Sequence, residues 1–174
     1  MKKLQTQIPV KTKKKGRRIE ERTIFVIESP EGKYVLHRRP NKGLLGGMWE
    51  LPNIQGKFSY NLLQNYYNEA IKIFPLGEAK HIFSHVEWYM TGIHMIFTKS
   101  DLMKEFCGQM FRNPMEAVDN TDIVEEEYKS NPMVREEIID IEFVNEKEFG
   151  LVTRDELKDS YALPAAFEAF KIWK

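Results

Sequence analysis

The chain has 174 residues, with 26 Lys+Arg against 26 Asp+Glu, 4 His and 1 Cys. This length suits one domain, and a hydrophobic content of 42% argues against a wholly disordered chain because it can supply a core. One cysteine excludes an internal disulfide and any all-cysteine zinc or iron–sulfur site within this chain. No apolar run approaches the ~20 residues of a membrane-spanning helix, and no apolar segment follows the basic N-terminus as in a signal peptide. We therefore expect a cytoplasmic protein without a membrane partner.

The net charge of +0 conceals two oppositely charged regions. Residues 2–22 carry nine bases and two acids, whereas residues 100–148 carry fourteen acids and five bases. We interpret residues 1–22 as a basic linker or arm. Its lysines either contact nucleic-acid phosphates with release of counterions or simply keep the arm solvated, and the charge alone leaves both interpretations open.

The folded part is expected to begin near Arg22 with a β-hairpin. Residues 23–27 and 33–38 are rich in β-branched and aromatic side chains and flank a turn signal at 30–32. A loop with three glycines follows at 40–47.

One long helix is predicted after this loop. Apolar residues between 62 and 74 recur at three- and four-residue spacing, which gives one buried stripe. Ser59 is a suitable N-cap, and Pro75 and Gly77 would end the helix.

Strand patterns return from residue 79 to 99, where the parity of the apolar residues changes at Gly92, as a β-bulge would require. Residues 100–137 form an acidic, Met-rich insertion, which we expect to be partly helical. Its one cysteine, Cys107, is expected to be a buried or partly buried thiol. Residues 138–144 alternate as in another strand.

Two short helices are predicted near the C-terminus. Residues 153–156 have the form of a capping box, and Pro164 would stand in the first turn of a terminal helix whose aromatic side chains share one face. Strands on both sides of a long helix indicate the α+β class, with a mixed sheet flanked by helices. The folded domain would then span residues 23–174 and carry the insertion.

Residues 43–52 resemble the Nudix-fold segment in the C-terminal domain of MutY adenine DNA glycosylases. In the same order, residues 9–15, 83–88 and 161–167 are similar to the linker, the Phe-Ser-His segment and the start of the C-terminal helix of that domain. The resemblance implies a Nudix-like domain that recognises DNA lesions in base excision repair. Its partner would be double-stranded DNA with 8-oxoguanine opposite adenine, in a bacterial cytoplasm at the nucleoid.

The resemblance further implies that Phe83, Ser84 and His85 approach the 8-oxoguanine. This base carries an N7–H donor where guanine has an acceptor, and a hydroxyl group can match either edge. Phe83 would stack or wedge at the base step, and His85 would contact the backbone or orient the segment. On residue type alone, these side chains could equally be a core phenylalanine, a serine at a strand end and a loop histidine. The proposed phosphate contacts lie in the basic arm: Lys11, Lys13 and Lys14.

The resemblance assigns the glycosylase chemistry to a separate helical domain that holds an iron–sulfur cluster on four cysteines. This chain lacks that cysteine set. We therefore expect no catalytic residue, no metal site and no cofactor here, and we expect the catalytic glycosylase domain to be a partner of this chain.

Two alternative functions remain open. A Nudix nucleotide pyrophosphohydrolase needs several carboxylates on one helix face to hold divalent cations. Here Leu51 and Pro52 precede Asn53 instead of two glycines, and Glu69 is the only carboxylate from residue 53 to 74, which predicts a degenerate metal box. The other alternative is a protein-interaction module in which the acidic insertion binds a repair or replication partner.

Overall fold

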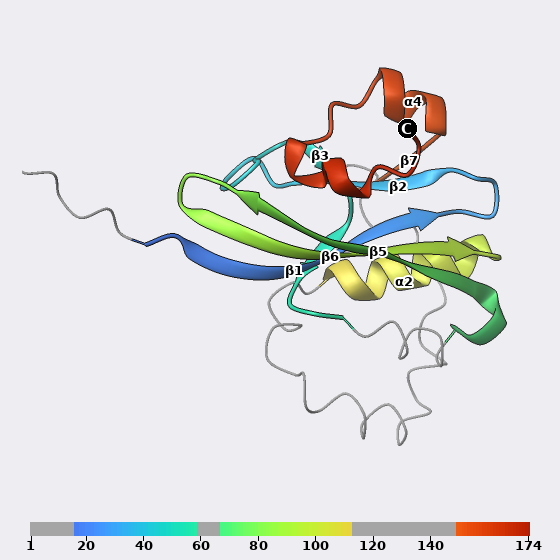
Figure 1. The fold of residues 1–174 in the computed structure, drawn as a ribbon. Helices are drawn as coiled ribbons and strands as arrows, with labels where there is room; N and C mark the ends of the chain where they lie inside the picture. The colour runs from blue at the N-terminus through green and yellow to red at the C-terminus, as the bar shows by residue number, and fades with distance from the viewer. Residues whose placement is uncertain (1–15, 59–66, 113–148) are drawn as a thin grey trace, which may run out of the picture.

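The computed structural model describes residues 16–58, 67–112 and 149–174, and within them a seven-stranded mixed sheet forms the centre of the fold (Figure 1). The strands run in the order β3-β2-β1-β6-β5, while β4 also pairs with β1 and β7 with β2. Only the pairing of β1 with β6 is parallel among these described strands. The strands are β1 (Arg18–Glu28), β2 (Tyr34–Arg38), β3 (Trp49–Glu50), β4 (Asn53–Gln55), β5 (Ile71–Ile82), β6 (Val86–Phe97) and β7 (Phe149–Val152).

Helices cover both faces of this sheet, which confirms the α+β class (Figure 1). The upper face carries α4 (Arg154–Asp159) and the 3₁₀ helix η3 (Ala165–Phe170), and the lower face carries α2 (Ser100–Arg112). A single 3₁₀ turn, η1 (Asn68–Ala70), leads into β5. Among the helices that the structure describes, none combines the length and the apolar character of a membrane-spanning helix.

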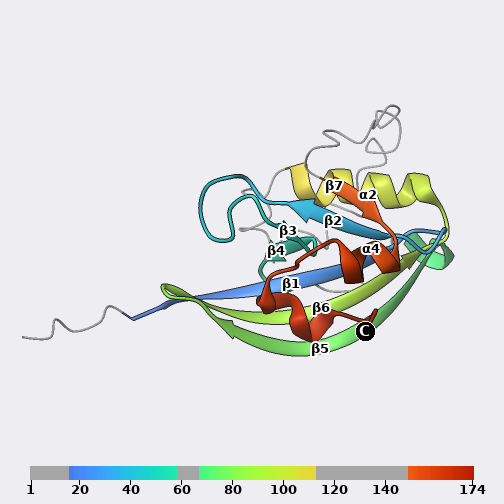
Figure 2. The same ribbon diagram turned by 90° about the horizontal axis from the view of Figure 1, so that it is seen from above.

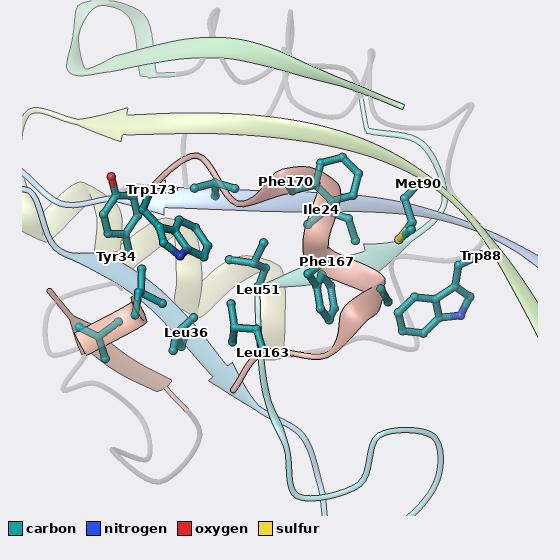
Figure 3. Close-up of a cluster of buried hydrophobic side chains, with 14 of the residues drawn as sticks. Ile24, Tyr34, Leu36, Leu51, Trp88, Met90, Leu163, Phe167, Phe170 and Trp173 are labelled. Carbon is teal, nitrogen blue, oxygen red and sulfur yellow. The ribbon is translucent and has the colours of Figure 1, made fainter. Parts of the chain in front are cut away.

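Two apolar clusters form the core, one on each face of the sheet. The upper cluster joins buried side chains of β1, β2 and β6 to the C-terminal segment, where Phe167, Phe170 and Trp173 are fully or almost fully buried (Figure 3). The lower cluster joins the opposite side chains of the same strands to Phe106 and Cys107 of α2. β1 therefore contributes alternate residues to both clusters, as expected for a strand at the centre of a covered sheet.

β1 begins at Arg18, so residues 18–22 belong to the sheet and not to the arm that the sequence analysis ended at residue 22. This segment pairs with β6 in parallel register from Arg18↔Val86 onward. Glu20 is buried although its neighbours are charged. Charged residues at a strand end look like a linker in the sequence, and only the pairing with β6 distinguishes the two.

The predicted helix over residues 62–74 is wrong from residue 71 onward, because Ile71–Ile82 forms β5 and pairs antiparallel with β6. Ile71 and Ile73 lie on the lower face while Phe74 is 47% exposed, which is a period of two. Pro75 lies within the strand instead of ending a helix, which an outer strand tolerates. The proposed cap Ser59 and residues 59–66 lie outside the described residues.

The predicted bulge is in β5 and not in β6. The register shifts between Pro75 and Gly77, which leaves Leu76 unpaired and sets Gly77 opposite Gly92. β6 itself pairs with β1 without interruption. Its apolar parity changes because the strand leaves the upper cluster after Met90 and enters the lower cluster at Ile93.

The other local predictions agree with the structure where it describes them. The hairpin of β1 and β2 is present, and residues 100–112 of the insertion form α2. Thr153 and Glu156 form the capping box of α4, and Pro164 precedes η3, which is a 3₁₀ helix. Residues 113–148, which include the predicted strand at 138–144, lie outside the described residues.

Candidate nucleic-acid interface

The three residues Phe83, Ser84 and His85 form the loop between β5 and β6, which we call the β5–β6 loop. It lies at the end of the sheet where β1 begins, as two perpendicular views show (Figures 1 and 2). The Phe83 N–H donates to the Val86 carbonyl at 2.8 Å and closes the turn. Ser84 and His85 are both exposed, so their side chains are available to a ligand.

Phe83 is half-buried and differs in this from its two neighbours. Its ring centroid lies 4.6 Å from that of His81 and 4.9 Å from that of Trp88, with edge-to-face geometry in both pairs. These distances lie within the preferred range for aromatic pairs. Phe83 therefore packs on the end of the upper cluster, so it anchors the loop and does not project from it.

Basic side chains lie next to this loop through the start of β1. The Arg18 N–H donates to the His85 carbonyl at 3.0 Å. The Arg18 side chain is 76% exposed and the Arg17 side chain 48%, with Arg17 Nη1 3.5 Å from a carboxylate oxygen of Glu87. Lys11, Lys13 and Lys14 lie outside the described residues. The basic region thus reaches the loop through two arginines that the sequence analysis did not select.

A buried charged cluster underlies the loop and was also missed from the sequence. Glu20 accepts a hydrogen bond from Trp88 Nε1 at 3.0 Å and one from Arg22 Nη1 at 3.0 Å, and it contacts the Arg18 guanidinium. Burial alone would raise the pKa of Glu20, but the hydrogen bonds and charges of Arg18 and Arg22 outweigh it, so its pKa lies below the ordinary value. The sequence signal was present, because residues 18, 20 and 22 continue the parity of Ile24.

The charged residues after β2 form a second buried cluster. Glu50 is 2% exposed, and both of its carboxylate oxygens lie 3.1 Å from Arg39 Nη1. His37 Nδ1 is 3.3 Å from the same carboxylate. Glu50 therefore serves as an internal partner of these bases, and two charged side chains of this strand end do not face solvent freely.

The sequence profile of the NUDIX domain matches residues 23–171, which is most of the chain. The chain belongs to the NUDIX domain family. This assignment agrees with the mixed sheet covered by helices on both faces.

Among curated proteins, this NUDIX domain is similar to adenine DNA glycosylases of mammals. It is 34% identical to the human enzyme over 92 residues and 33% identical to the mouse enzyme over 93 residues, in each case 45% of this chain. The matched part is 17% of the human and 18% of the mouse protein, so the chain spans about a sixth of these relatives. These matches confirm the resemblance to adenine DNA glycosylases seen in the sequence motifs.

A solved structure with a similar fold is the C-terminal domain of mouse MUTYH, determined in complex with human PCNA. It aligns with a TM-score of 0.50 at 17% sequence identity and covers 88% of this chain and 86% of that one. At this identity the likeness concerns the fold.

The NUDIX fold of this chain carries few acidic groups where a metal-dependent member needs them. Glu69 stands in η1 and is exposed, and no other carboxylate occurs from residue 53 to 74. Asn53, which follows Leu51 and Pro52, instead accepts hydrogen bonds from Arg22 Nε at 2.9 Å and Nη2 at 2.7 Å. Within residues 16–58, 67–112 and 149–174, the His, Cys, Asp and Glu side chains form no group of three or more that could hold a metal ion.

Proposed function

We propose that this chain is the lesion-recognition domain of an adenine DNA glycosylase and senses 8-oxoguanine opposite adenine in double-stranded DNA. The observation that carries the proposal is the similarity to two adenine DNA glycosylases in a chain whose Phe-Ser-His segment forms an accessible loop. Had Ser84 and His85 been buried in the core, the proposal would have failed.

Ser84 is the proposed lesion contact. Its hydroxyl can accept a hydrogen bond from the N7–H of 8-oxoguanine and can donate to the C8 carbonyl, whereas guanine offers an acceptor at N7 and no carbonyl at C8. Phe83 supports this contact from below, since its ring is held between His81 and Trp88. His85 is exposed beside Ser84 and is the proposed contact to the DNA backbone.

Affinity for the duplex is assigned to phosphate contacts of the basic residues. Arg17 and Arg18 lie beside the loop, and the proposed contacts Lys11, Lys13 and Lys14 precede them in the chain. Such contacts release counterions, so binding should weaken as salt concentration rises. Base discrimination should depend on the loop and not on these residues.

The proposal leaves the cleavage of the adenine N-glycosidic bond to a catalytic domain outside this chain. An iron–sulfur cluster of the four-cysteine type does not fit the residues present, because Cys107 is the one cysteine and is buried in the lower cluster. No step of base removal is therefore assigned to this chain.

The test is a binding measurement with two duplexes that differ only in 8-oxoguanine or guanine opposite adenine. The 174-residue chain should bind the lesion duplex more tightly, and Ser84→Ala should reduce that ratio by about fivefold, the effect of one lost polar contact. Gln55→Ala is the matched control, because Gln55 is an exposed polar residue of β4 away from the loop. Equal affinity of the unaltered chain for both duplexes would refute the proposal.

One alternative keeps specific support, namely a protein-interaction module in the acidic insertion. The solved MUTYH domain is a complex with PCNA, and residues 100–148 of this chain carry fourteen acids. A deletion test must spare α2, because Met103, Phe106 and Cys107 belong to the lower cluster. Deletion of residues 113–137 followed by a pull-down with PCNA separates this function from DNA binding.

A further inference from the structure

Glu20 is one of only two carboxylates that are buried among the described residues, the other being Glu50. A buried carboxylate costs free energy unless it is paired and hydrogen-bonded, and an apolar replacement is often as stable. The fold of the upper cluster does not need a charge at its end. The position of Glu20 therefore calls for a reason beyond core formation.

The first contact of Glu20 fixes the orientation of Trp88. The indole Nε1–H donates to Glu20 Oε2 at 3.0 Å, and the Arg22 guanidinium carbon lies over the indole at 4.4 Å from its centroid. Figure 3 shows Trp88 at one end of the upper cluster, with Tyr34 and Trp173 at the other. Trp88 is fully buried, so a bond to its one polar atom selects one ring orientation.

Trp88 in turn supports the β5–β6 loop. The Phe83 ring meets it at 4.9 Å between centroids with an interplanar angle of 69°. Because edge-to-face packing depends on the direction of both rings, a rotated indole would remove the surface on which Phe83 rests. Ser84 follows Phe83 directly in the chain, so the orientation of Trp88 also affects the proposed lesion contact.

The second contact of Glu20 holds the other side of the same loop. Its carboxylate contacts the Arg18 guanidinium, and the Arg18 backbone N–H donates to the His85 carbonyl at 3.0 Å. One carboxylate thus connects the supports at both ends of the loop, through Trp88 below Phe83 and through Arg18 beside His85.

We propose that Glu20 is a positioning residue for lesion recognition, which keeps Phe83 and Arg18 in place so that the β5–β6 loop meets DNA already ordered. Its part in recognition rests on the proposed function above. A loop that is ordered before binding loses less conformational entropy when it binds, and it can reject a base whose edge does not match.

The experiment compares Glu20→Gln with Glu21→Gln in the 174-residue chain. Both changes remove one negative charge from adjacent residues of β1, but the Glu21 side chain is 56% exposed and contacts only Lys57, at 3.5 Å, among its printed ion-pair partners. Amide hydrogen exchange of Phe83, followed by NMR, reports the order of the loop without DNA. The amide of Phe25, which donates to the Pro52 carbonyl at 2.8 Å, serves as the reference for the core.

Glu20→Gln should accelerate exchange at Phe83 by about tenfold while exchange at Phe25 stays the same. It should also lower the ratio of affinities for the 8-oxoguanine and guanine duplexes by about fivefold. Glu21→Gln should change neither quantity. Unchanged exchange at Phe83 would overturn the proposal, and so would faster exchange with an unchanged affinity ratio.

A second variant tests the route through the indole. Trp88→Phe removes the N–H donor but leaves Glu20 with both arginines, and it should accelerate exchange at Phe83 as Glu20→Gln does. The double variant should be no worse than either single one, since both break the same link. Additive effects would overturn the route through Trp88. If Glu20→Gln does not fold, normal exchange at Phe83 in Trp88→Phe overturns the proposal.

The two proposals can fail separately in these measurements. If the unaltered chain binds both duplexes equally, the proposed function is refuted, and the role of Glu20 in recognition is refuted with it. The exchange data then still show whether Glu20 orders the loop. If the unaltered chain discriminates and Glu20→Gln does so equally well, only the role of Glu20 is refuted.

Discussion

Gly92 occupies a position in β6 that has no room for a side chain, and Gly92→Ala is predicted to destabilise the domain. A methyl group there would stand 2.5 Å from Phe170 Cε1 and 2.9 Å from Leu76 Cβ, and it would also clash with Phe170 Cδ1. The ring would have to move about 0.9 Å to reach the 3.4 Å at which ordinary contact begins. Phe170 is 1% exposed and lies within the upper cluster, so such a movement disturbs its neighbours.

The expected cost follows from two opposing effects. Overpacking in a core costs about 1–3 kcal/mol, whereas replacement of glycine stabilises by about 0.4–1 kcal/mol through the unfolded chain. The net loss should be about 1–2 kcal/mol. For a chain of this size that is a fall in Tm of roughly 2–8 °C, since each kcal/mol corresponds to about 2–4 °C.

Thermal and urea unfolding followed by circular dichroism would measure this loss. Gly16→Ala is the control, because no atom lies within 4 Å of a methyl group at that position. Phe170→Leu in the Gly92→Ala background should recover part of the loss, with a coupling energy above about 0.5 kcal/mol. A Gly92→Ala variant as stable as Gly16→Ala, or a coupling energy of zero, would refute the close approach of Phe170 to β6.

Two further predictions concern α4 and α2. Thr153→Ala should cost about 0.5–2 kcal/mol in urea unfolding, because its hydroxyl no longer accepts the hydrogen bond of the Glu156 N–H, at 3.3 Å; Thr153→Ser should keep most of that stability, and equal losses in both variants would contradict the capping box. Burial raises the pKa of Cys107 to about 12, so at pH 8 a thiol reagent should label it only as fast as the domain opens, and immediate labelling of the native chain would contradict its position in the lower cluster.

The sequence predicted the elements whose causes are local. The capping box needs only Thr153 and Glu156 three residues apart. The hairpin of β1 and β2 needs only apolar runs on either side of a turn at Gly32, whose φ of 74° suits glycine. In both cases the deciding interactions lie within a few residues of one another.

Elements that depend on distant partners were predicted less well. Residues 71–74 fit a helical stripe and a strand alike, and pairing with β6 some twenty residues later decides for the strand. A single sequence does not contain that pairing in its local pattern. Tertiary context overrides helical periodicity here, as it often does for short apolar segments.

The candidate interface shows the same division. Phe83, Ser84 and His85 were selected through their resemblance to a family segment, and the structure brings them together as one exposed turn beside β1. The support below them was not predicted, since Glu20 and Trp88 are 68 positions apart. A charged residue in a basic stretch resembles linker sequence until its partner is known.

The upper cluster takes five of its buried members from the last dozen residues of the chain, among them Phe167, Phe170 and Trp173. A ribosome makes those residues last, so every earlier strand emerges before its covering layer exists. The upper sheet face must then stay open to solvent or to a chaperone until synthesis reaches Trp173. A nascent chain stalled a few codons earlier should remain sensitive to protease, although nearly all of its sheet has already been translated.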